Sequence, residues 1–265
     1  LQSCAYRESD IGTVTPFSNN GTICSYPVFP VSNELPFQWT AAELDKVFQL
    51  ANAGTNYEIP TAVGFCMYIK RSCLNETGPF DEENFGLGYG EECDFSLRAS
   101  ASGWKHVVAA DVFVYHEGGA SFASESSQRK RDADQVMSDL HPEYHQLINE
   151  FLHSDSLYDA RRNVDAVRLK ERPEDVNTIL EEHSRYTRSI LARVVDNYEA
   201  MLSEREQRQT LERMLADTRK QFTDTDHALA EAQKVVENMK EDYERHISNM
   251  EQSRSWRYTK WLRRE

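Results

Sequence analysis

Glycine and cysteine are missing from the second half of this sequence. All 11 glycines and all five cysteines of its 265 residues lie at or before Gly119. The cysteines are odd in number and lack a paired C-x-x-C spacing, which predicts reduced, mostly buried thiols in a cytosolic protein rather than a disulfide framework. No run approaches the ~20 apolar residues of a membrane span. The net charge is −14 and basic residues form no stripe outside the last dozen positions, which argues against nucleic acid as a partner.

What the sequence does contain is a first part with both extended and helical patterns. Extended segments are predicted at Gly12–Thr15, Val63–Lys70 and Val107–Tyr115. Helices are predicted at Ala41–Ala53, Asp94–Ser102, Ser127–Asp139, His141–His153 and Ser156–Arg172. This mixture predicts an α/β fold, in which half of a sheet domain is followed by helices that pack on it.

Two adjacent carboxylates, Glu91 and Glu92, follow a glycine-dense turn at Gly86–Gly90. Glycine supplies the positive-φ conformations that such a turn needs. Asp94 and Arg98 continue at helical spacing, so the two glutamates are expected at a helix N-terminus, where the backbone dipole favours their ionised form. An ionised carboxylate beside a pocket can act as a general base toward a sugar hydroxyl. The alternative is structural, with one glutamate capping the helix and the other solvated.

Three motifs occur in fixed order between Gly64 and Phe122. Their sequences are GFCMYIKR, FDEENFGLGYGEECDFSLRASASGW and VFVYHEGGASF. In this order they resemble the C-terminal half of a bacterial family 2 glycosyltransferase domain, an inverting enzyme with the Rossmann-like GT-A fold. Three further segments resemble the O-antigen and polysaccharide-synthesis branch of that family: TPFSNNGTICSYP upstream, and HPEYHQLINEF and DSLYDARRNVDAVRL downstream. The resemblance covers residues 1–170.

The resemblance implies roles for individual residues. Glu92 matches the base that deprotonates the acceptor hydroxyl, and Glu91 matches the acidic position before it, so both are candidate catalytic residues. His116 matches a histidine that helps to hold the metal or the leaving diphosphate. Substrate-binding or site-orienting roles are implied for Gly64, Asp81, Glu82, Asp94, Arg98 and Trp104.

The resemblance also implies a nucleotide-sugar donor, a saccharide acceptor and a divalent metal, Mg²⁺ or Mn²⁺. In this family the metal-binding Asp-x-Asp precedes the TPFSNN segment, so the main ligands are expected outside this chain, which would begin within the domain. Asp132–Asp134 and Asp224–Asp226 have this spacing but are interpreted as chance matches in charged, helical sequence. Considered alone, His116 is more typical of a hydrogen-bonded structural residue. Asp81 and Glu82 equally suit a solvated turn.

An apolar heptad repeat runs from Val176 to Met250, a stretch without glycine or proline. One seam contains Leu215, Phe222, Leu229, Val236, Tyr243 and Met250, and its weaker companion contains Leu211, Thr218, Thr225, Ala232, Met239 and His246. The repeat predicts a self-associating coiled coil, with a single amphipathic helix packing on its own protein as the alternative. The predicted organisation is a catalytic half-domain at 1–125, a helical extension at 126–172, the coiled coil at 176–250 and a linker at 251–265.

The segment from Ser253 to Arg264 interleaves five basic with three aromatic side chains. This composition suits the anionic headgroups of a membrane, or else a helix end that packs on a further domain. We expect a cytoplasmic protein, at the inner face of the membrane. Two functions are considered. The first is a hexosyl- or deoxyhexosyltransferase of polysaccharide synthesis, and this fragment alone would be inactive. The alternative is a non-catalytic coiled-coil module that assembles a polysaccharide-synthesis complex. A third and weaker hypothesis is a carbohydrate-binding module, because it would give the paired glutamates and His116 no common function.

Overall fold

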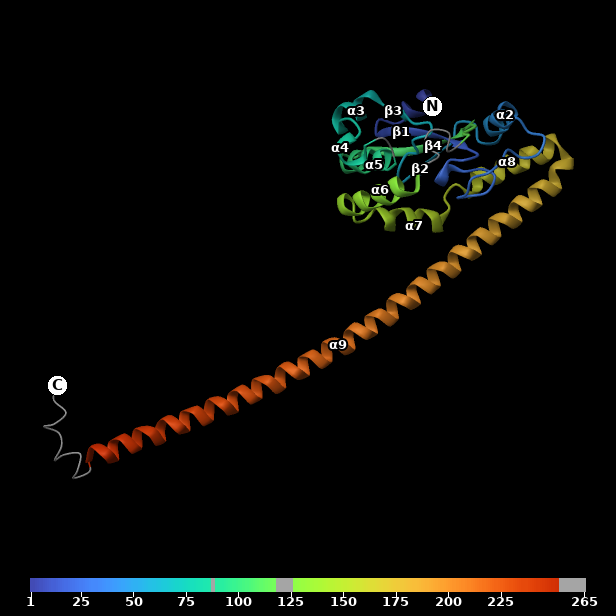
Figure 1. Cartoon of the computed structure of the whole chain (residues 1–265). Helices are drawn as coiled ribbons and strands as arrows, with labels where there is room; N and C mark the ends of the chain where they lie inside the picture. The colour runs from blue at the N-terminus through green and yellow to red at the C-terminus, as the bar shows by residue number, and fades with distance from the viewer. Residues whose placement is uncertain (87–88, 118–125, 253–265) are drawn as a thin grey trace. The chain divides into compact units, whose positions relative to one another are not determined.

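The computed structural model describes residues 1–86, 89–117 and 126–252 of the chain (Figure 1). The chain divides into two compact units, Leu1–Leu191 and Ala192–Glu265. Ile179 and Glu182, in the first turns of helix α9 (Val176–Gln252), are buried in the first unit. The division therefore lies later in the chain than the predicted start of the coiled coil at Val176.

A four-stranded mixed sheet forms the centre of the first unit, in the order β2-β4-β1-β3. Its strands are β1 (Ile11–Ser18), β2 (Asn56–Ile59), β3 (Tyr68–Ile69) and β4 (Lys105–Val114). β1 and β4 run parallel with Val14 opposite Val107, while β3 pairs antiparallel with β1 and β2 pairs antiparallel with β4. The predicted α/β class is confirmed.

Helices surround this sheet (Figure 1). They are α1 (Gln2–Ala5), α2 (Ala41–Ala51), α3 (Arg71–Thr77), α4 (Glu82–Phe85), α5 (Glu91–Ala101), α6 (Ser126–Leu140), α7 (Tyr144–Ser154) and α8 (Tyr158–Glu171), with 3-10 turns η1 (Thr22–Cys24) and η2 (Pro173–Asp175). The main core joins α2 and α8 to one face of the sheet, and a smaller cluster joins α1 to the other face.

The two central strands are long and apolar because they are covered on both faces. All eight residues of β1 are buried. In β4, Val108 and Ala110 are exposed to less than 1 % and pack in the main core, whereas Val107 and Ala109 pack beside α1. Pro16 lies in β1 at a register shift against β4, which is where a strand tolerates a residue without an N–H.

His106 fastens β4 to α5. Its Nε2–H donates to the Ser96 carbonyl at 2.8 Å, and the Thr13 hydroxyl bonds to its Nδ1 at 2.7 Å. Burial lowers the pKa of His106 to about 4, so the ring is neutral under physiological conditions. α5 is thereby fixed against the sheet.

Three short elements differ from the sequence-based expectations. The extended segment expected at Val63–Lys70 contributes only β3, because the exposed Gly64 and its neighbours form a loop instead. Strand β2 was not predicted, since Asn56 and Glu58 make it polar, as an edge strand can be. Helix α3 begins directly after Lys70, in a segment for which no helix or strand was predicted.

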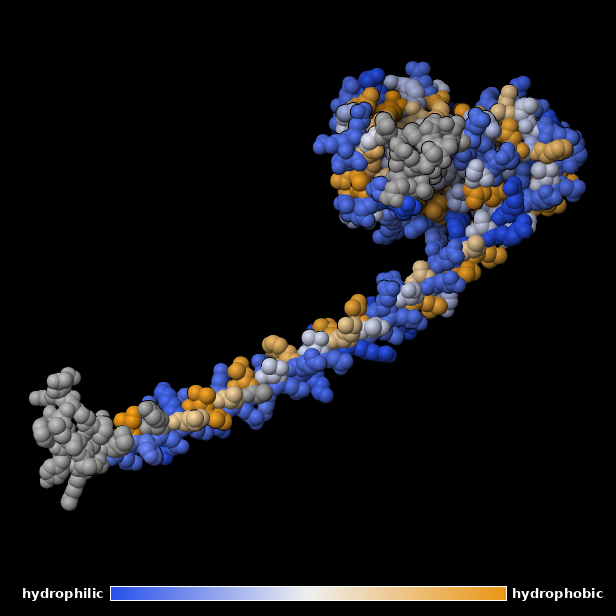
Figure 2. Space-filling model, viewed as in Figure 1, coloured by the Kyte–Doolittle hydropathy of each residue, from blue (hydrophilic) through white to orange (hydrophobic). Residues whose placement is uncertain are grey.

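In the second unit, α9 exposes the apolar residues of the predicted repeat. Leu215, Phe222, Leu229 and Val236 are 53%, 69%, 56% and 64% exposed, and Figure 2 shows apolar side chains recurring along the helix. The predicted long helix is confirmed, and the coiled coil stays a prediction. None of the helices in the described ranges combines the length and apolar character needed to cross a membrane. The basic and aromatic segment at 253–264 lies outside the described residues.

Candidate active site

The N-terminus of α5 presents the two glutamates. Gly90 precedes the helix with φ 99°, a left-handed conformation that favours glycine. A Cβ at Gly90 would also lie 2.9 Å from the Phe85 ring. The helix therefore begins at Glu91, and both glutamates occupy its first turn as predicted, although residues 87–88 of the preceding turn lie outside the described residues.

The carboxyl group of Glu92 is half-buried beside the loop at Gly64. A Cβ at Gly64 would stand 3.4 Å from Glu92 Cδ and Oε1, so the missing side chain lets the loop approach the carboxyl group. Burial raises the pKa of Glu92, and the negative charge of Glu91 raises it further. Backbone amides of Glu92, Gly64 and Gly90 oppose this shift with smaller effects. The backbone at the helix N-terminus thus favours the ionised form, as expected, but burial and the neighbouring charge have the larger effect on the pKa.

Glu91 does not share this setting. Its side chain is absent from the lining of the cavity described below, and within the described part of the chain its buried Oε2 has no hydrogen-bond partner. Its contact with Glu92 is electrostatic, through the charge that raises the pKa of Glu92.

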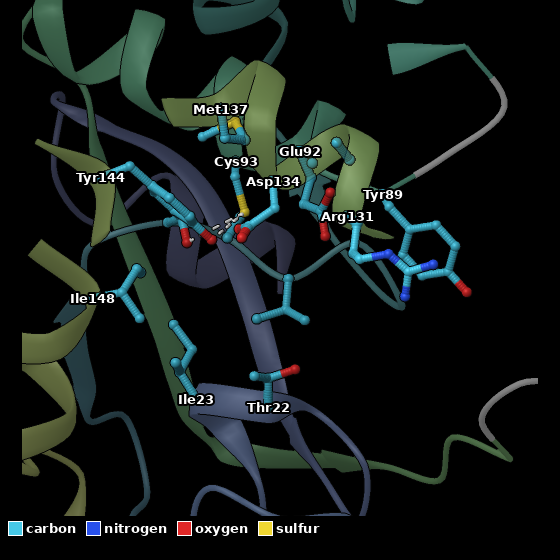
Figure 3. Close-up of a pocket in the computed structure, with 15 residues that line it drawn as sticks. Thr22, Ile23, Tyr89, Glu92, Cys93, Arg131, Asp134, Met137, Tyr144 and Ile148 are labelled. Atoms are coloured by element: carbon cyan, nitrogen blue, oxygen red, sulfur yellow. Dashed lines mark hydrogen bonds between the residues drawn. The ribbon is translucent and has the colours of Figure 1, made fainter. Parts of the chain in front are cut away.

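Glu92 lines a cavity of about 430 Å³ (Figure 3). The lining comes from η1, the loop after β2, the start of α5, and helices α6 and α7: Thr22, Ile23, Thr61, Ala62, Val63, Tyr89, Gly90, Glu92, Cys93, Arg131, Ala133, Asp134, Met137, Tyr144 and Ile148. The volume is in the range of small-molecule sites. Segments far apart in the sequence thus meet around two carboxyl groups, those of Glu92 and Asp134.

A sulfur-centred chain of contacts joins three walls of this cavity. The Tyr144 hydroxyl of α7 donates to Cys93 Sγ at 3.4 Å, and Cys93 Sγ lies 3.9 Å from Thr61 Oγ1. Burial, followed by the charge of Glu92, raises the pKa of Cys93 to about 12. The thiol is therefore protonated and unsuited to nucleophilic chemistry.

His116 is held at the end of β4 by a neighbouring loop. Its backbone N–H donates to Asn19 Oδ1 at 2.8 Å, and its Nδ1 lies 2.7 Å from the Asn20 carbonyl. A carbonyl only accepts, so Nδ1 carries the proton and Nε2 keeps a free lone pair. The ring stacks on Phe65 at 5.2 Å, next to the Gly64 that contacts Glu92.

The geometry of His116 suits a single ligand to a metal ion, because an Nδ1–H···O=C bond is the usual way to orient such a histidine. In the described ranges, no three His, Cys, Asp or Glu side chains gather into a metal site. Any cation bound near His116 would need further ligands from elsewhere.

Asp94 and Arg98 hold the helix that carries Glu92. Asp94 is 3% exposed and accepts from Arg98 Nε at 2.8 Å and from His141 Nε2 at 2.9 Å. Arg98 also donates to the Thr77 and Pro79 carbonyls. These contacts join α5 to the α3–α4 connection and to the turn before α7. Neither side chain lines the cavity, so both have positioning rather than binding geometry.

Three other predicted substrate-binding residues lie away from the cavity. Asp81 caps α4, and its hydrogen bonds to Asn84 lower the pKa of the carboxyl group. Glu82 is exposed in the first turn of the same helix. Trp104 donates to Glu76 at 3.0 Å and packs with the α3–α5 cluster. Of the predicted residues, the structure brings Gly64 against Glu92, and Glu92 alone among them lines the cavity.

Most of the remaining wall residues carry no signal in the sequence that marks them as part of a site. Met137, Tyr144 and Ile148 stand at helical spacing in the segments predicted as helices, but nothing in that pattern shows which face meets Glu92. Thr22 and Ile23 lie in the TPFSNN region, whose resemblance pointed to a family without assigning them a role.

Comparison with known proteins adds one match. Residues 30–135 match the family model described as Glycosyltransferase like family 2. No curated protein and no solved structure matches the chain. The matched range contains α2, α5, β4 and the Glu92 side of the cavity, whereas α7 lies beyond it. This part of the chain is thus similar to family 2 glycosyltransferases, which supports a domain of that family and glycosyl transfer as its general activity.

Proposed function

We propose that the protein transfers a sugar from a nucleotide-sugar donor to a saccharide hydroxyl, with inversion, and that Glu92 is the general base. The observation that carries this proposal is the placement of Glu92: an ionisable carboxyl group faces a cavity of substrate size within the family-matched region. Its raised pKa also suits the role, because a stronger base accepts a hydroxyl proton more readily.

The proposed reaction is a single displacement. The Glu92 carboxylate takes the proton from the acceptor hydroxyl while the oxygen of that hydroxyl bonds to the anomeric carbon of the donor. The bond from that carbon to the nucleotide diphosphate breaks, and the diphosphate leaves with the electron pair. Because attack and departure occur on opposite sides of the carbon, the configuration inverts.

Glu91 supports this step through its charge. A second carboxylate beside Glu92 disfavours the ionised form of the base and so raises its pKa. The proposed role of Glu91 is therefore to tune the base, not to accept the proton itself.

A divalent cation, Mg²⁺ or Mn²⁺, is part of the proposal. His116 offers one ligand through Nε2, with the ring already oriented by Asn20 and Phe65. When bound, the cation would supply positive charge that stabilises the departing diphosphate.

The proposed setting is the synthesis of cell-surface polysaccharide, such as O-antigen, by a cytoplasmic enzyme that contacts the inner membrane through residues 253–264. A second candidate function is assembly without catalysis. The exposed apolar residues along α9 favour it, since such a helix suits association with further copies of the chain.

The decisive experiment compares full-length wild type with Glu92→Gln in assays of sugar transfer, using a panel of nucleotide sugars with Mg²⁺ or Mn²⁺. We expect the variant to lose roughly 10²–10⁴-fold in kcat, the usual contribution of a general base, while donor binding is retained. Glu83→Gln makes the same change on the exposed surface of α4 and serves as control. Equal turnover of wild type and Glu92→Gln would remove Glu92 from this role. No transfer by folded wild type would favour the assembly function.

A further inference from the structure

We propose that Asp134 is a second acceptor-binding residue, whose carboxylate accepts a hydrogen bond from a hydroxyl of the acceptor saccharide other than the one that Glu92 deprotonates. The acceptor must then keep that second hydroxyl free. A saccharide that lacks it, or that carries a substituent on its oxygen, is a poor acceptor. This inference rests on the proposed function, because it takes the cavity as the acceptor site.

Asp134 lies on α6 and lines the same cavity of about 430 Å³ as Glu92, which lies on α5. Figure 3 shows the two carboxyl groups on one side of the cavity and Ile23 on the other. Burial and the neighbouring Cys93 raise the pKa of the Tyr144 hydroxyl most, and the charges of Glu92 and Asp134 raise it further. Both carboxylates therefore act on one point of the wall, and a saccharide that fills the cavity contacts both.

The Asp134 carboxylate is free to bind a ligand. Nε2 of His145 lies 3.7 Å from Asp134 Oδ1, which is too long for a hydrogen bond. Ser138 donates its one hydroxyl proton to the Asp134 backbone carbonyl, so His145 Nε2, at 2.9 Å, donates to the Ser138 oxygen instead. In the described part of the chain, neither carboxylate oxygen of Asp134 accepts a hydrogen bond, and the side chain is 64% exposed.

A carboxylate selects its ligand because it accepts hydrogen bonds and donates none. Asp134 and Glu92 are the two carboxylates of the lining, whereas Arg131 only donates and the threonine and tyrosine hydroxyls can do either. A ligand that covers Asp134 without offering a donor removes water from the charge and returns nothing. Loss of one hydrogen bond to a charged group reduces affinity by roughly 10–100-fold, and the partial exposure of Asp134 favours the lower end.

Asp134 also belongs to the string Asp132–Asp134, which has the spacing of a metal-binding motif. Ala133, Asp134 and Met137 of α6 line the cavity, but Asp132 does not. Residues two apart on a helix do not face each other, so the two carboxylates are not arranged to share one cation. The structure therefore leaves Asp134 alone to face a ligand.

The test uses the full-length protein and one accepted saccharide, with deoxy and O-methyl analogues at each hydroxyl other than the reactive one. For wild type we expect one position at which both analogues lower kcat/KM by about 10-fold or more, mainly through KM. Asp134→Ala should lower kcat/KM for the parent saccharide by a similar factor. At that same position it should no longer distinguish the parent from the deoxy analogue, because the hydroxyl and the carboxylate are the two ends of one bond. Asp134→Asn, which keeps the size of the side chain, should tolerate the O-methyl analogue, since its amide can donate to the ether oxygen.

The control is His145→Gln, which removes the ring beside Asp134 but keeps a donor for Ser138 and does not change the cavity lining. It should retain the wild-type preference. Loss of the preference in His145→Gln as well would show that Asp134 acts only by holding α7 to α6, and would overturn the inference.

Calorimetric titration of the acceptor gives a readout without turnover. In the Glu92→Gln background, Asp134→Ala should raise the Kd of the parent saccharide by about 10-fold and leave that of the deoxy analogue unchanged. Additive effects of Asp134→Ala and of hydroxyl removal at every position would overturn the inference and leave the proposed function intact. Absence of transfer to every saccharide would instead overturn the proposed function, and this inference with it.

Discussion

At the scale of the single residue, the pKa of the Glu92 carboxyl group depends on effects of opposite sign. Its position in the first helical turn and nearby backbone amides favour the carboxylate, while burial and the charge of Glu91 favour the protonated form. The second pair of effects wins, and the pKa is raised. A base of this kind holds its proton more firmly than a solvated glutamate, which is useful while a leaving group departs.

Glu91→Gln tests this balance. Removal of the neighbouring negative charge should lower the pKa of Glu92, because the ionised base would no longer be repelled. The acidic limb of the kcat/KM profile should therefore move to lower pH, and the plateau should fall because a weaker base remains. The measurement is kcat/KM against pH for wild type, Glu91→Gln and the surface control Glu83→Gln. An acidic limb that stays in place in Glu91→Gln would show that Glu91 does not tune the base.

The sequence predicted the place of Glu92 at the start of a helix but not the burial of its carboxyl group. A glycine turn followed by helical spacing is a local signal, so the helix start at Glu91 could be inferred from adjacent residues. Burial of the carboxyl group depends on Gly64 and on helices α6 and α7, which reach it through the fold. Long-range packing of this kind leaves no mark in a single sequence.

At the scale of the element, a buried ion network fastens α8 to the start of α9. Arg168 is fully buried in α8 and donates to Glu182 Oε2 and to the Tyr26 hydroxyl at 2.7 Å each. It also donates to Asp175 Oδ2 at 2.9 Å, within η2. Tyr26 follows η1 by two residues, so the same network supports the segment that supplies Ile23 to the cavity.

Arg168→Met should destabilise the protein by about 3–5 kcal/mol, because Asp175 and Glu182 would remain buried without their cation. Combining it with Glu182→Gln should restore part of that loss, since one of the two uncompensated charges is removed. The measurement is the free energy of unfolding from urea titration of wild type, both single variants and the double variant. Strict additivity of the two single changes would show that Arg168 and Glu182 are not coupled.

Helices of this region were easier to predict than the network that joins them. The positions of α6, α7 and α8 follow from apolar spacing over one or more turns, and their predicted bounds differ from the observed ones mainly at the ends. Tyr26 and Arg168 lie 142 positions apart. Only the folded chain brings them together, and the local spacing of α8 does not show which of its charges are buried.

At the scale of the whole molecule, the main question is what covers the apolar residues of α9. Beyond Leu191 the large apolar residues that the structure describes are exposed in the single chain, from 37% for Ile247 to 69% for Phe222. The heptad spacing that exposes them on one side is the pattern by which helices pair. Association with further copies of the chain would bury them and bring several catalytic units into one assembly.

Phe222→Lys and Leu229→Lys should weaken this association, since each places a charge in the apolar seam. Sedimentation equilibrium should give wild type a mass that is a multiple of the chain mass, and the double variant a mass near that of one chain. His227→Lys adds the same charge between these seam positions in sequence but off the seam, and should leave the assembly intact. A wild-type mass of one chain at the highest concentration measured would contradict the prediction.

The composition of the whole chain predicted its largest division, but not the point where it falls. Loss of glycine after Gly119 signals a change to helical structure, and the helices follow it. The first compact unit nevertheless extends to Leu191, because Glu182 and its neighbours in α9 complete the buried network. The sequence before and after Leu191 has the same helix propensity. What changes there is the burial of the side chains, which propensity does not show.

The cavity wall also has a consequence for how such a chain can diverge. Glu92 and its turn lie in one stretch of sequence, while Met137 and Ile148 lie in another. Contacts join the second stretch to the rest of the unit: His141 binds Asp94, Tyr144 binds Cys93, and Phe151 and Leu152 pack on the main core. Wall residues outside these contacts are the ones that can vary with the least effect on the fold. Under the proposed function, substitutions at these wall positions would change which ligand the cavity accepts, while Glu92 and its turn stay the same.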